Sequence, residues 1–267
     1  MKFSVLMSTY VKDSPLFLEE ALASIKNQTL KASQIVIIKD GKLNDQLEKV
    51  INSFNELPIE AYLYNGDGNL GGALNYGLKY INNSLVFRMD SDDISKKDRF
   101  EVMIREFRKR HCDVLGCYIE EFCSDPKDLG QIRKVPELVT EKNLQLRNQV
   151  NHVSVLFNKN SVIACGGYEA CEYLEDWYLW LRMVKSNKKI FNIPETLVYV
   201  RVGNGFIERR SGINYALKLM NGFLKFRKNN LISSISFISL LFTSVLPRLL
   251  PNIILNFIYK RFARNKK

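Results

Sequence analysis

The stretch Val86-Phe87-Arg88-Met89-Asp90-Ser91-Asp92-Asp93 joins a short apolar run to three carboxylates within four residues. An apolar run of this kind predicts a buried strand, and the acids begin where the chain leaves the sheet. Like charges this close repel one another, so a positive charge is expected between them. A hard divalent cation held by carboxylate oxygens, with phosphates completing its coordination, meets that need. The alternative is an acidic turn before a helix N-terminus, where Asp is favoured in any case.

Strand-like and helix-like segments alternate through the first half of the chain. The segments that read as buried strands are 3–8, 35–38, 60–64 and 86–89, and those with helical spacing are 15–28, 46–54 and 73–81. Apolar strands alternating with helices predict an α/β fold with a mostly parallel sheet covered on both faces. Ligands bind at the carboxyl ends of such strands. Because three strand exits carry Thr9, Asp40 and Asp90–Asp93, we expect these polar groups at one edge.

Composition and charge narrow the class of protein. A chain of 267 residues that is 46% apolar can form one large α/β domain with an appendage. Its five cysteines contain no C-x-x-C pair and it has only two histidines, which favours reduced thiols over a zinc site or disulfide framework. Ten basic residues and no acid lie in 211–267, so ten of the eleven net positive charges belong to that segment. A nucleic-acid binder would spread its charge over the folded domain, so no nucleic-acid partner is expected.

The glycines at 66, 68 and 71 have the spacing of a dinucleotide-binding turn, but they follow the third strand and lack the acidic residue that such a site needs. They either contact a ligand or simply open the next helix. Further along, Leu174-Glu175-Asp176-Trp177 opens another segment with helical spacing, where Asp176 is either an N-terminal cap or a functional acid. Val153–Phe157 and Thr196–Val200 read as strands, and Arg201 follows the second of them.

Taken together, these features resemble family 2 glycosyltransferases of the GT-A fold, and most of all the bacterial enzymes that assemble surface polysaccharides or lipopolysaccharide side chains. The resemblance covers residues 3–210, and the motifs occur in family order: Val5–Tyr10, Lys39-Asp40-Gly41, Asn69 to Gly77, Asp90–Asp93, Asn151-His152, Gly166-Gly167-Tyr168 and Glu175-Asp176-Trp177. Each motif alone has low specificity, but the ordered set is specific. One departure is Lys39, where many members carry a second acid.

The resemblance implies an inverting glycosyltransferase that moves a single sugar from a nucleotide-diphosphate sugar, with UDP as the expected nucleotide, to a saccharide acceptor. Asp92, with Asp90 and Asp93, would hold Mn²⁺ or Mg²⁺ against the leaving diphosphate. Asp176 matches the family's general base, with Glu175 beside it. The residues expected to bind the nucleotide sugar are Ser8, Thr9, Tyr10, Asp40, Asn69, Gly71, Asn75, Asp90 and Arg201. Arg209 and Arg210 are weaker candidates for the diphosphate, with ordinary surface charge as the alternative.

The expected organisation is a catalytic domain over 1–210, with a nucleotide-sugar-binding half over 1–95 and an acceptor-binding half over 96–210, and a basic helical tail over 211–267. The apolar stretch 231–246 falls short of the roughly 20 residues that span a bilayer. Apolar segments beside basic residues instead suit the headgroup region of an anionic leaflet. We therefore expect a cytoplasmic protein held peripherally on the inner leaflet of the plasma membrane, beside a lipid-linked acceptor. The alternatives are helices packed on the catalytic domain and a spanning helix.

Two other classes of protein share parts of this pattern. A nucleotidyltransferase also binds a metal and a nucleotide on an α/β sheet, but Ser8-Thr9-Tyr10-Val11 does not resemble the G-G-x-G-T-R-L sequence of that class. A membrane-bound scaffold with an inactive transferase domain would be expected to lose its acids first, and both acidic groups are present. The glycosyltransferase is therefore the favoured function.

Overall fold

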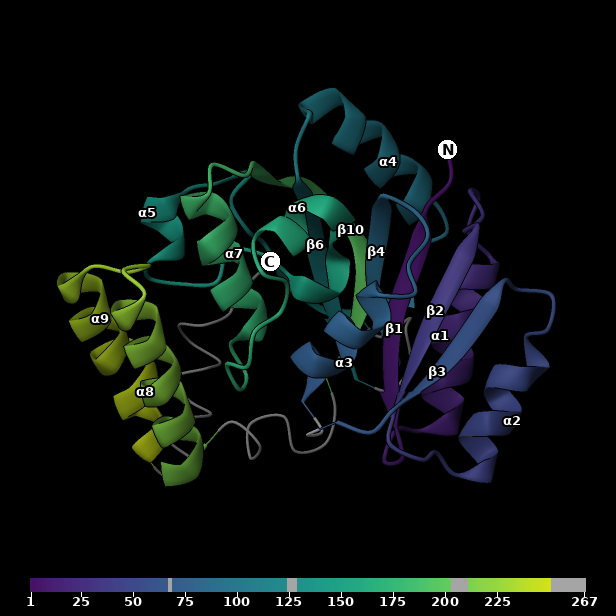
Figure 1. Ribbon diagram of the computed structural model, residues 1–267, viewed down its shortest axis with the longest axis horizontal. Helices are drawn as coiled ribbons and strands as arrows, with labels where there is room; N and C mark the ends of the chain where they lie inside the picture. The colour runs from purple at the N-terminus through teal and green to yellow at the C-terminus, as the bar shows by residue number, and fades with distance from the viewer. Residues whose placement is uncertain (67–68, 124–128, 203–210, 251–267) are drawn as a thin grey trace.

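The computed structural model describes residues 1–66, 69–123, 129–202 and 211–250 (Figure 1). The strands are β1 (Ser4–Tyr10), β2 (Gln34–Asp40), β3 (Ile59–Tyr64), β4 (Leu85–Asp90), β5 (Ile94–Ser95), β6 (Val114–Phe122), β7 (Leu129–Arg133), β8 (Leu138–Val139), β9 (Leu156–Asn158) and β10 (Ile190–Arg201). The helices are α1 (Pro15–Lys26), α2 (Asp45–Ser53), α3 (Leu70–Leu78), α4 (Arg99–Arg110), α5 (Glu141–Leu144), α6 (Lys159–Ala164), α7 (Glu175–Lys185), α8 (Ile213–Lys228) and α9 (Ser234–Leu240). Shorter helical turns are η1 (His152–Ser154), η3 (Leu241–Val245) and η4 (Leu246–Leu249).

One mixed sheet runs through the described part of the chain, in the order β3-β2-β1-β4-β9-β6-β10-β5, with β7 beside β6 and β8 beside β10. Its first half is the predicted parallel sheet, because β3, β2, β1 and β4 all pair in parallel. Successive side chains of a strand point to opposite faces. Val5 and Met7 accordingly pack in the core with α1 and α2, whereas Leu6 packs in the core with α3. Both faces are covered, as the non-alternating apolar strands predict.

The second half of the sheet departs from a parallel arrangement. The short strand β9 lies antiparallel between β4 and β6 and so joins the two halves. The predicted strand Val153–Phe157 is wrong in its first part, where the chain forms the turn η1 instead. The Ser154 hydroxyl donates to the Asn151 carbonyl (2.7 Å), and the Asn151 amide donates to the Cys117 carbonyl (2.9 Å). These local side-chain bonds compete with the strand ladder and shorten it.

The described part of the tail, 211–250, packs on the catalytic domain. Helix α8 buries Phe223 and Phe226 against α7, whose Trp177 ring lies 5.8 and 5.6 Å from theirs, centroid to centroid. Helices α8 and α9 lie together at one end of the molecule, outside α7 (Figure 1). The predicted apolar run 253–259 and the basic end 260–267 lie outside the described residues. No helix of the described part is both long enough and apolar enough to cross a membrane.

Candidate active site

The acidic loop after β4 forms a compact group of carboxylates. Ligand oxygens of Asp90, Asp92 and Asp93 lie within 4.8 Å of one another. Burial, and then the charge of Asp90, raise the pKa of Asp92 to about 6 and that of Asp93 well above its ordinary value. These shifts mean that burial and mutual repulsion make the ionised forms of these carboxyl groups costly. Three crowded oxygen donors of this kind fit Mn²⁺ or Mg²⁺, which prefer carboxylate ligands.

Arg88 is the cation nearest to this loop, and it lies inside the sheet. Its side chain is 3% exposed and forms an ion pair with Asp90. Its positive charge also lowers the pKa values of Asp92, Glu175 and Asp176, partly offsetting the rise that burial causes. Arg88 therefore acts electrostatically on both the acidic loop and the second carboxylate pair. Arg88 is the one charged residue in the apolar run Val86–Met89. The sequence therefore marked the residue but did not indicate this role.

Asp13 joins the exit loop of β1 to the acidic loop, and sequence analysis missed it. Its Oδ2 accepts hydrogen bonds from the Thr9 hydroxyl (2.9 Å), the Tyr10 backbone N–H (3.2 Å) and the Ser91 hydroxyl (2.7 Å). Burial raises the pKa of this carboxyl group, which these hydrogen bonds partly offset. The signal available in the sequence was an acid directly after a strand exit and before the Pro15 helix start. Thr9 is buried and serves this link.

The predicted nucleotide-side residues come together at the carboxyl edge of the parallel half-sheet. Tyr10 is paired with Asp40 in the register of β1 and β2, and Asp40 with Tyr64 in that of β2 and β3. On the other side of β1, Ser8 is paired with Asp90. Tyr10 is exposed, and Asp40 is partly exposed. The order of the strands therefore places these side chains in one row that ends at the acidic loop.

Two residues at the start of α3, Asn69 and Gly71, help to position this helix beside the site. Asn69 caps the helix by accepting a hydrogen bond from the Gly72 N–H (2.6 Å). A Cβ atom at Gly71 would lie 3.4 Å from the Cβ atoms of Glu175 and Tyr168, so the glycine lets α3 approach α7 closely. Both positions thus hold α3 in place beside the second carboxylate pair.

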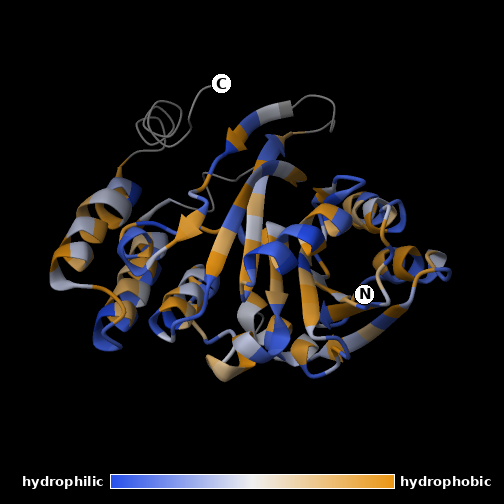
Figure 2. Ribbon diagram, turned by 90° about the horizontal axis from the view of Figure 1, so that it is seen from above, coloured by the Kyte–Doolittle hydropathy of each residue, from blue (hydrophilic) through white to orange (hydrophobic). Residues whose placement is uncertain are grey.

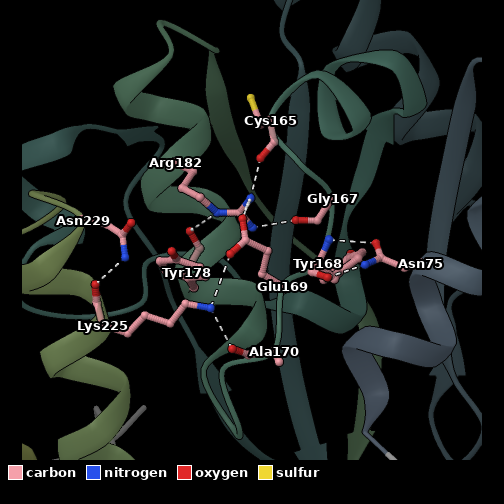
Figure 3. A network of polar contacts seen from close by, with 10 residues as sticks. All are labelled: Asn75, Cys165, Gly167, Tyr168, Glu169, Ala170, Tyr178, Arg182, Lys225 and Asn229. Carbon is pink, nitrogen blue, oxygen red and sulfur yellow. Dashed lines mark hydrogen bonds and ion pairs between the residues drawn. The ribbon is translucent and has the colours of Figure 1, made fainter. Parts of the chain in front are cut away.

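Asn75, predicted to bind the nucleotide sugar, contacts the backbone of a turn in this structure. Its side chain clasps the backbone of Tyr168, donating to the carbonyl and accepting from the N–H (2.8 Å) (Figure 3). The turn that contains Tyr168 has left-handed backbone at Gly166 and Gly167, with φ values of +84° and +64°. A side chain at Gly167 would meet the Asn75 amide at 2.6 Å. Asn75 is therefore a structural residue that fixes this turn.

A network of polar contacts continues from the turn to α7 and α8 (Figure 3). The Arg182 guanidinium donates to the Gly167 carbonyl (2.6 Å) and pairs with Glu169 at 2.9 Å. The Lys225 ammonium pairs with the other oxygen of Glu169 (3.3 Å) and donates to the Ala170 carbonyl (2.8 Å). The turn, α7 and α8 are thereby held as one unit.

The second carboxylate pair occupies the first turn of α7. The Asn148 amide donates to Asp176 Oδ2 (2.7 Å), and the Trp177 N–H donates to Asp176 Oδ1 (2.7 Å). Burial raises the pKa of Asp176, and burial together with the charge of Asp176 raises the pKa of Glu175 to about 7. A carboxylate that is fixed in direction and made more basic suits a general base. Asn148, which holds it, was not found from the sequence.

Arg201, predicted to bind the nucleotide sugar, is held by groups of the protein itself. Its side chain is 5% exposed, forms an ion pair with Glu20 of α1 and lies between the rings of Phe17 (3.9 Å to the centroid) and Phe122 (4.4 Å). Its backbone N–H donates to Asp93 Oδ1 (2.8 Å), and its Nε donates to the Asp92 carbonyl (3.2 Å). These contacts brace the acidic loop. Arg209 and Arg210 lie outside the described residues.

A parallel half-sheet that ends in a carboxylate cluster, opposite a second and more basic carboxylate pair, is suited to metal-assisted group transfer. Comparison with known proteins identifies the class of protein, and this chain is a glycosyltransferase. It belongs to the family described as Glycosyl transferase family 2, whose pattern matches residues 4–214. The family match selects this class over the nucleotidyltransferase.

Two curated relatives are similar over most of their length. A UDP-Gal:alpha-D-GlcNAc-diphosphoundecaprenol beta-1,3-galactosyltransferase of Escherichia coli is 40% identical over 98% of this chain and 97% of its own. The amylovoran biosynthesis glycosyltransferase AmsE of Erwinia amylovora is 35% identical over 80% of this chain and 81% of its own.

Solved structures confirm the predicted GT-A fold. TarS of S. aureus, in complex with UDP-GlcNAc, has a TM-score of 0.69 at 16% identity, with 91% of this chain and 74% of that chain covered. The mannosyltransferase PcManGT of Pyrobaculum calidifontis, in complex with GDP-Man and Mn²⁺, has a TM-score of 0.68 at 14% identity, with 98% and 75% covered. At these identities the likeness concerns the fold alone.

Proposed function

We propose that this glycosyltransferase moves galactose from UDP-galactose to the GlcNAc end of a diphosphate-linked lipid, in the assembly of a bacterial surface polysaccharide. The observation that carries the proposal is the near full-length identity of 40% to the Escherichia coli enzyme whose name states this donor and acceptor. The protein adds one sugar and inverts the anomeric carbon, because the acceptor attacks from the face opposite the leaving UDP.

The donor lies along the carboxyl edge of the parallel half-sheet. Asp40 binds the uridine and Tyr10 lines the same pocket, which fits their adjacent places in the β1–β2 register. Asp92, with Asp90 and Asp93, holds the divalent ion, Mn²⁺ or Mg²⁺, which when bound neutralises charge on the leaving diphosphate. Arg88, paired with Asp90, keeps that carboxylate directed toward the loop.

Asp176 acts as the general base that takes the proton from the attacking acceptor hydroxyl. Two hydrogen bonds, from Asn148 and from the Trp177 N–H, fix its direction and leave lone pairs for the acceptor. The raised pKa makes it a better proton acceptor than an exposed carboxylate. Glu175 lies in the same helical turn, and the charge of Asp176 together with burial raises its own pKa to about 7.

The protein works on the cytoplasmic face of the membrane, where a lipid-linked acceptor is available, and its partner there is the inner leaflet. The support for this location is the absence of acids and the ten basic residues in 211–267, together with the diphospholipid acceptor of the relative. An anionic leaflet attracts such a segment.

A donor panel tests the proposal directly. Thermal unfolding is measured with UDP-galactose, UDP-glucose, UDP-GlcNAc and GDP-mannose, each with and without Mn²⁺, and UDP release is measured with a GlcNAc-diphosphate acceptor. We expect the largest stabilisation and turnover with UDP-galactose plus Mn²⁺, because a ligand that binds the folded state raises its stability. Asp92→Ala should remove the Mn²⁺-dependent part. Preference for another donor would refute the galactose assignment, and no turnover with any donor would favour the inactive scaffold.

A further inference from the structure

Helix α8 carries apolar residues on two sides. Its inner side packs on α7 and includes Phe223 and Phe226, which are 1% and 0% exposed. Its opposite side carries Ile213, Leu217 and Leu224, which are 66%, 55% and 39% exposed. The inner side already provides the apolar contact between α8 and α7. The outer apolar residues therefore require a different explanation, because a soluble helix normally turns polar residues to water.

The returning segment α9–η3–η4 has a second exposed apolar row. Residues in it recur every three or four positions, which places them on one side of a helical segment: Ile235 (81% exposed), Ile238 (52%), Phe242 (65%), Leu246 (47%) and Leu249 (51%). Helix α8 contacts α9, η3 and η4, so the two rows belong to one packed pair. We call the two rows together the outer face.

The outer face is unusual for this molecule. Nine of the eighteen large apolar residues that are exposed in the described chain fall in its last forty residues, 211–250, so the exposure is concentrated and not scattered. Figure 2 shows apolar segments of ribbon along these helices at one end of the molecule. A concentrated apolar surface of this kind marks an interaction site.

The charge of the tail indicates which kind of partner the outer face binds. Residues 211–267 contain no acid, and Lys228 is exposed beside the outer face while Arg227 and Arg248 are partly exposed. The chain continues from Leu250 into a further apolar run, 253–259, and ends in 260–267 with five basic residues. A second copy that paired tail to tail would bring the same cations together, because the described tail contains no acid to match them. A surface with anionic headgroups over hydrocarbon matches both properties.

We propose that the outer face docks into the headgroup region of an anionic bilayer. This inference rests on the proposed function, since a diphospholipid acceptor lies in that bilayer, and it names the surface that meets the membrane. The docking surface is not a flexible tether. Helix α8 packs on α7, whose first turn carries Asp176, and Lys225 and Arg182 join both helices to the turn after Gly167. Docking the outer face therefore fixes the direction of the catalytic base relative to the membrane.

The test measures binding of the full chain to vesicles of phosphatidylcholine alone and to vesicles that also contain phosphatidylglycerol. The variant Ile235→Ser/Phe242→Ser removes two exposed residues of the outer face. The control, Leu138→Ser/Ile163→Ser, removes two large apolar residues that are also exposed (52% and 50%) but lie outside the outer face. We expect binding to the anionic vesicles to fall by roughly tenfold or more in the first variant, to stay unchanged in the control, and to weaken with salt.

Turnover on a short-chain, detergent-soluble acceptor should stay within about twofold of wild type in both variants, since neither touches the site. Wild-type vesicle binding by Ile235→Ser/Phe242→Ser, or equal binding to both kinds of vesicle, would overturn the proposal. So would a concentration-dependent dimer that the variant abolishes, because a second copy would then cover the face. Stronger vesicle binding after deletion of 251–267 would show instead that this segment covers it. Vesicle binding needs no donor, so a wrong donor assignment leaves this result readable.

Discussion

Asp176→Asn separates the catalytic role of this residue from its structural role. The change removes basicity while the new amide oxygen can still accept from the Trp177 N–H, now 2.7 Å from Oδ1. General bases contribute about 10² to 10⁴ in rate, which is about 3–5 kcal/mol of transition-state stabilisation. We therefore expect kcat to fall by that factor, with the affinity for UDP-galactose nearly unchanged, since the donor does not contact this carboxylate.

The structure also predicts the effect of this substitution on stability. The new amide group turns a donor toward the Asn148 amide, which now donates to Oδ2 at 2.7 Å, so this bond is lost. A hydrogen bond to a charged group contributes about 1.5–3 kcal/mol. The loss is offset in part because the buried carboxylate, whose pKa burial raises, is no longer present. The melting temperature should therefore fall by only a few degrees, roughly 2–4 °C per kcal/mol for a chain of this size.

A reciprocal exchange makes the test stringent. Adding Asn148→Asp to Asp176→Asn reverses donor and acceptor across the same 2.7 Å contact, so it should restore stability without restoring turnover. Glu172→Gln is the control for charge alone, because Glu172 is exposed and pairs with Lys218 on the surface. UDP release, donor titration calorimetry and thermal unfolding report the three quantities. If Asp176→Asn keeps more than about a tenth of kcat, which is about 1.4 kcal/mol, the base is another group. Recovery of turnover in the exchanged pair would refute the reasoning equally.

Two further predictions concern Glu175 and Arg201. Because the pKa of Glu175 is raised from 4.5 to about 7, the folded state keeps a proton that the unfolded state releases in this window, so the free energy of unfolding falls as pH rises through it, by about 3 kcal/mol. Glu175→Gln should flatten this fall in urea titrations between about pH 4.5 and pH 7; an unchanged slope would contradict the shift. Arg201→Met should weaken Mn²⁺ binding roughly tenfold, about 1.4 kcal/mol, because the contact of the Arg201 side chain with the Asp92 carbonyl is lost. Glu20→Gln should act in the same direction and less strongly, and normal Mn²⁺ affinity in both, measured by electron paramagnetic resonance, would exclude the brace.

The local sequence pattern was sufficient to predict those features that a single helix or strand determines by itself. The apolar strands and their exits predicted the parallel half-sheet, and the strand order then brought Ser8, Tyr10, Asp40 and Asp90 to one edge. Helical spacing indicated that Glu175 and Asp176 open a helix, and the resemblance to the family implied their role as a pair. These features depend on periodicity and on charge within a few residues.

Features that depend on distant partners were not predictable. Arg201 follows a strand exit as a diphosphate ligand would, yet its direction is decided by Glu20, which lies 181 residues away in the sequence. The tail was assigned to the membrane as a whole because it is apolar and basic. Composition does not say that the Phe223 side of α8 faces protein while the Leu217 side is exposed. The sequence shows that both sides are apolar, and only the packing on α7 separates them.

The charges of the site explain why its stability and its function are linked. Burial raises the pKa of a carboxyl group in Asp13, in the acidic loop after β4 and in the first turn of α7. Keeping these buried carboxylates ionised costs stability. Natural proteins accept such a cost where a ligand must bind. A divalent ion would supply positive charge to the acidic loop, while burial keeps the pair on α7 basic for the acceptor. The cost of burying carboxylates at this edge of the sheet is therefore one that a bound cation would relieve.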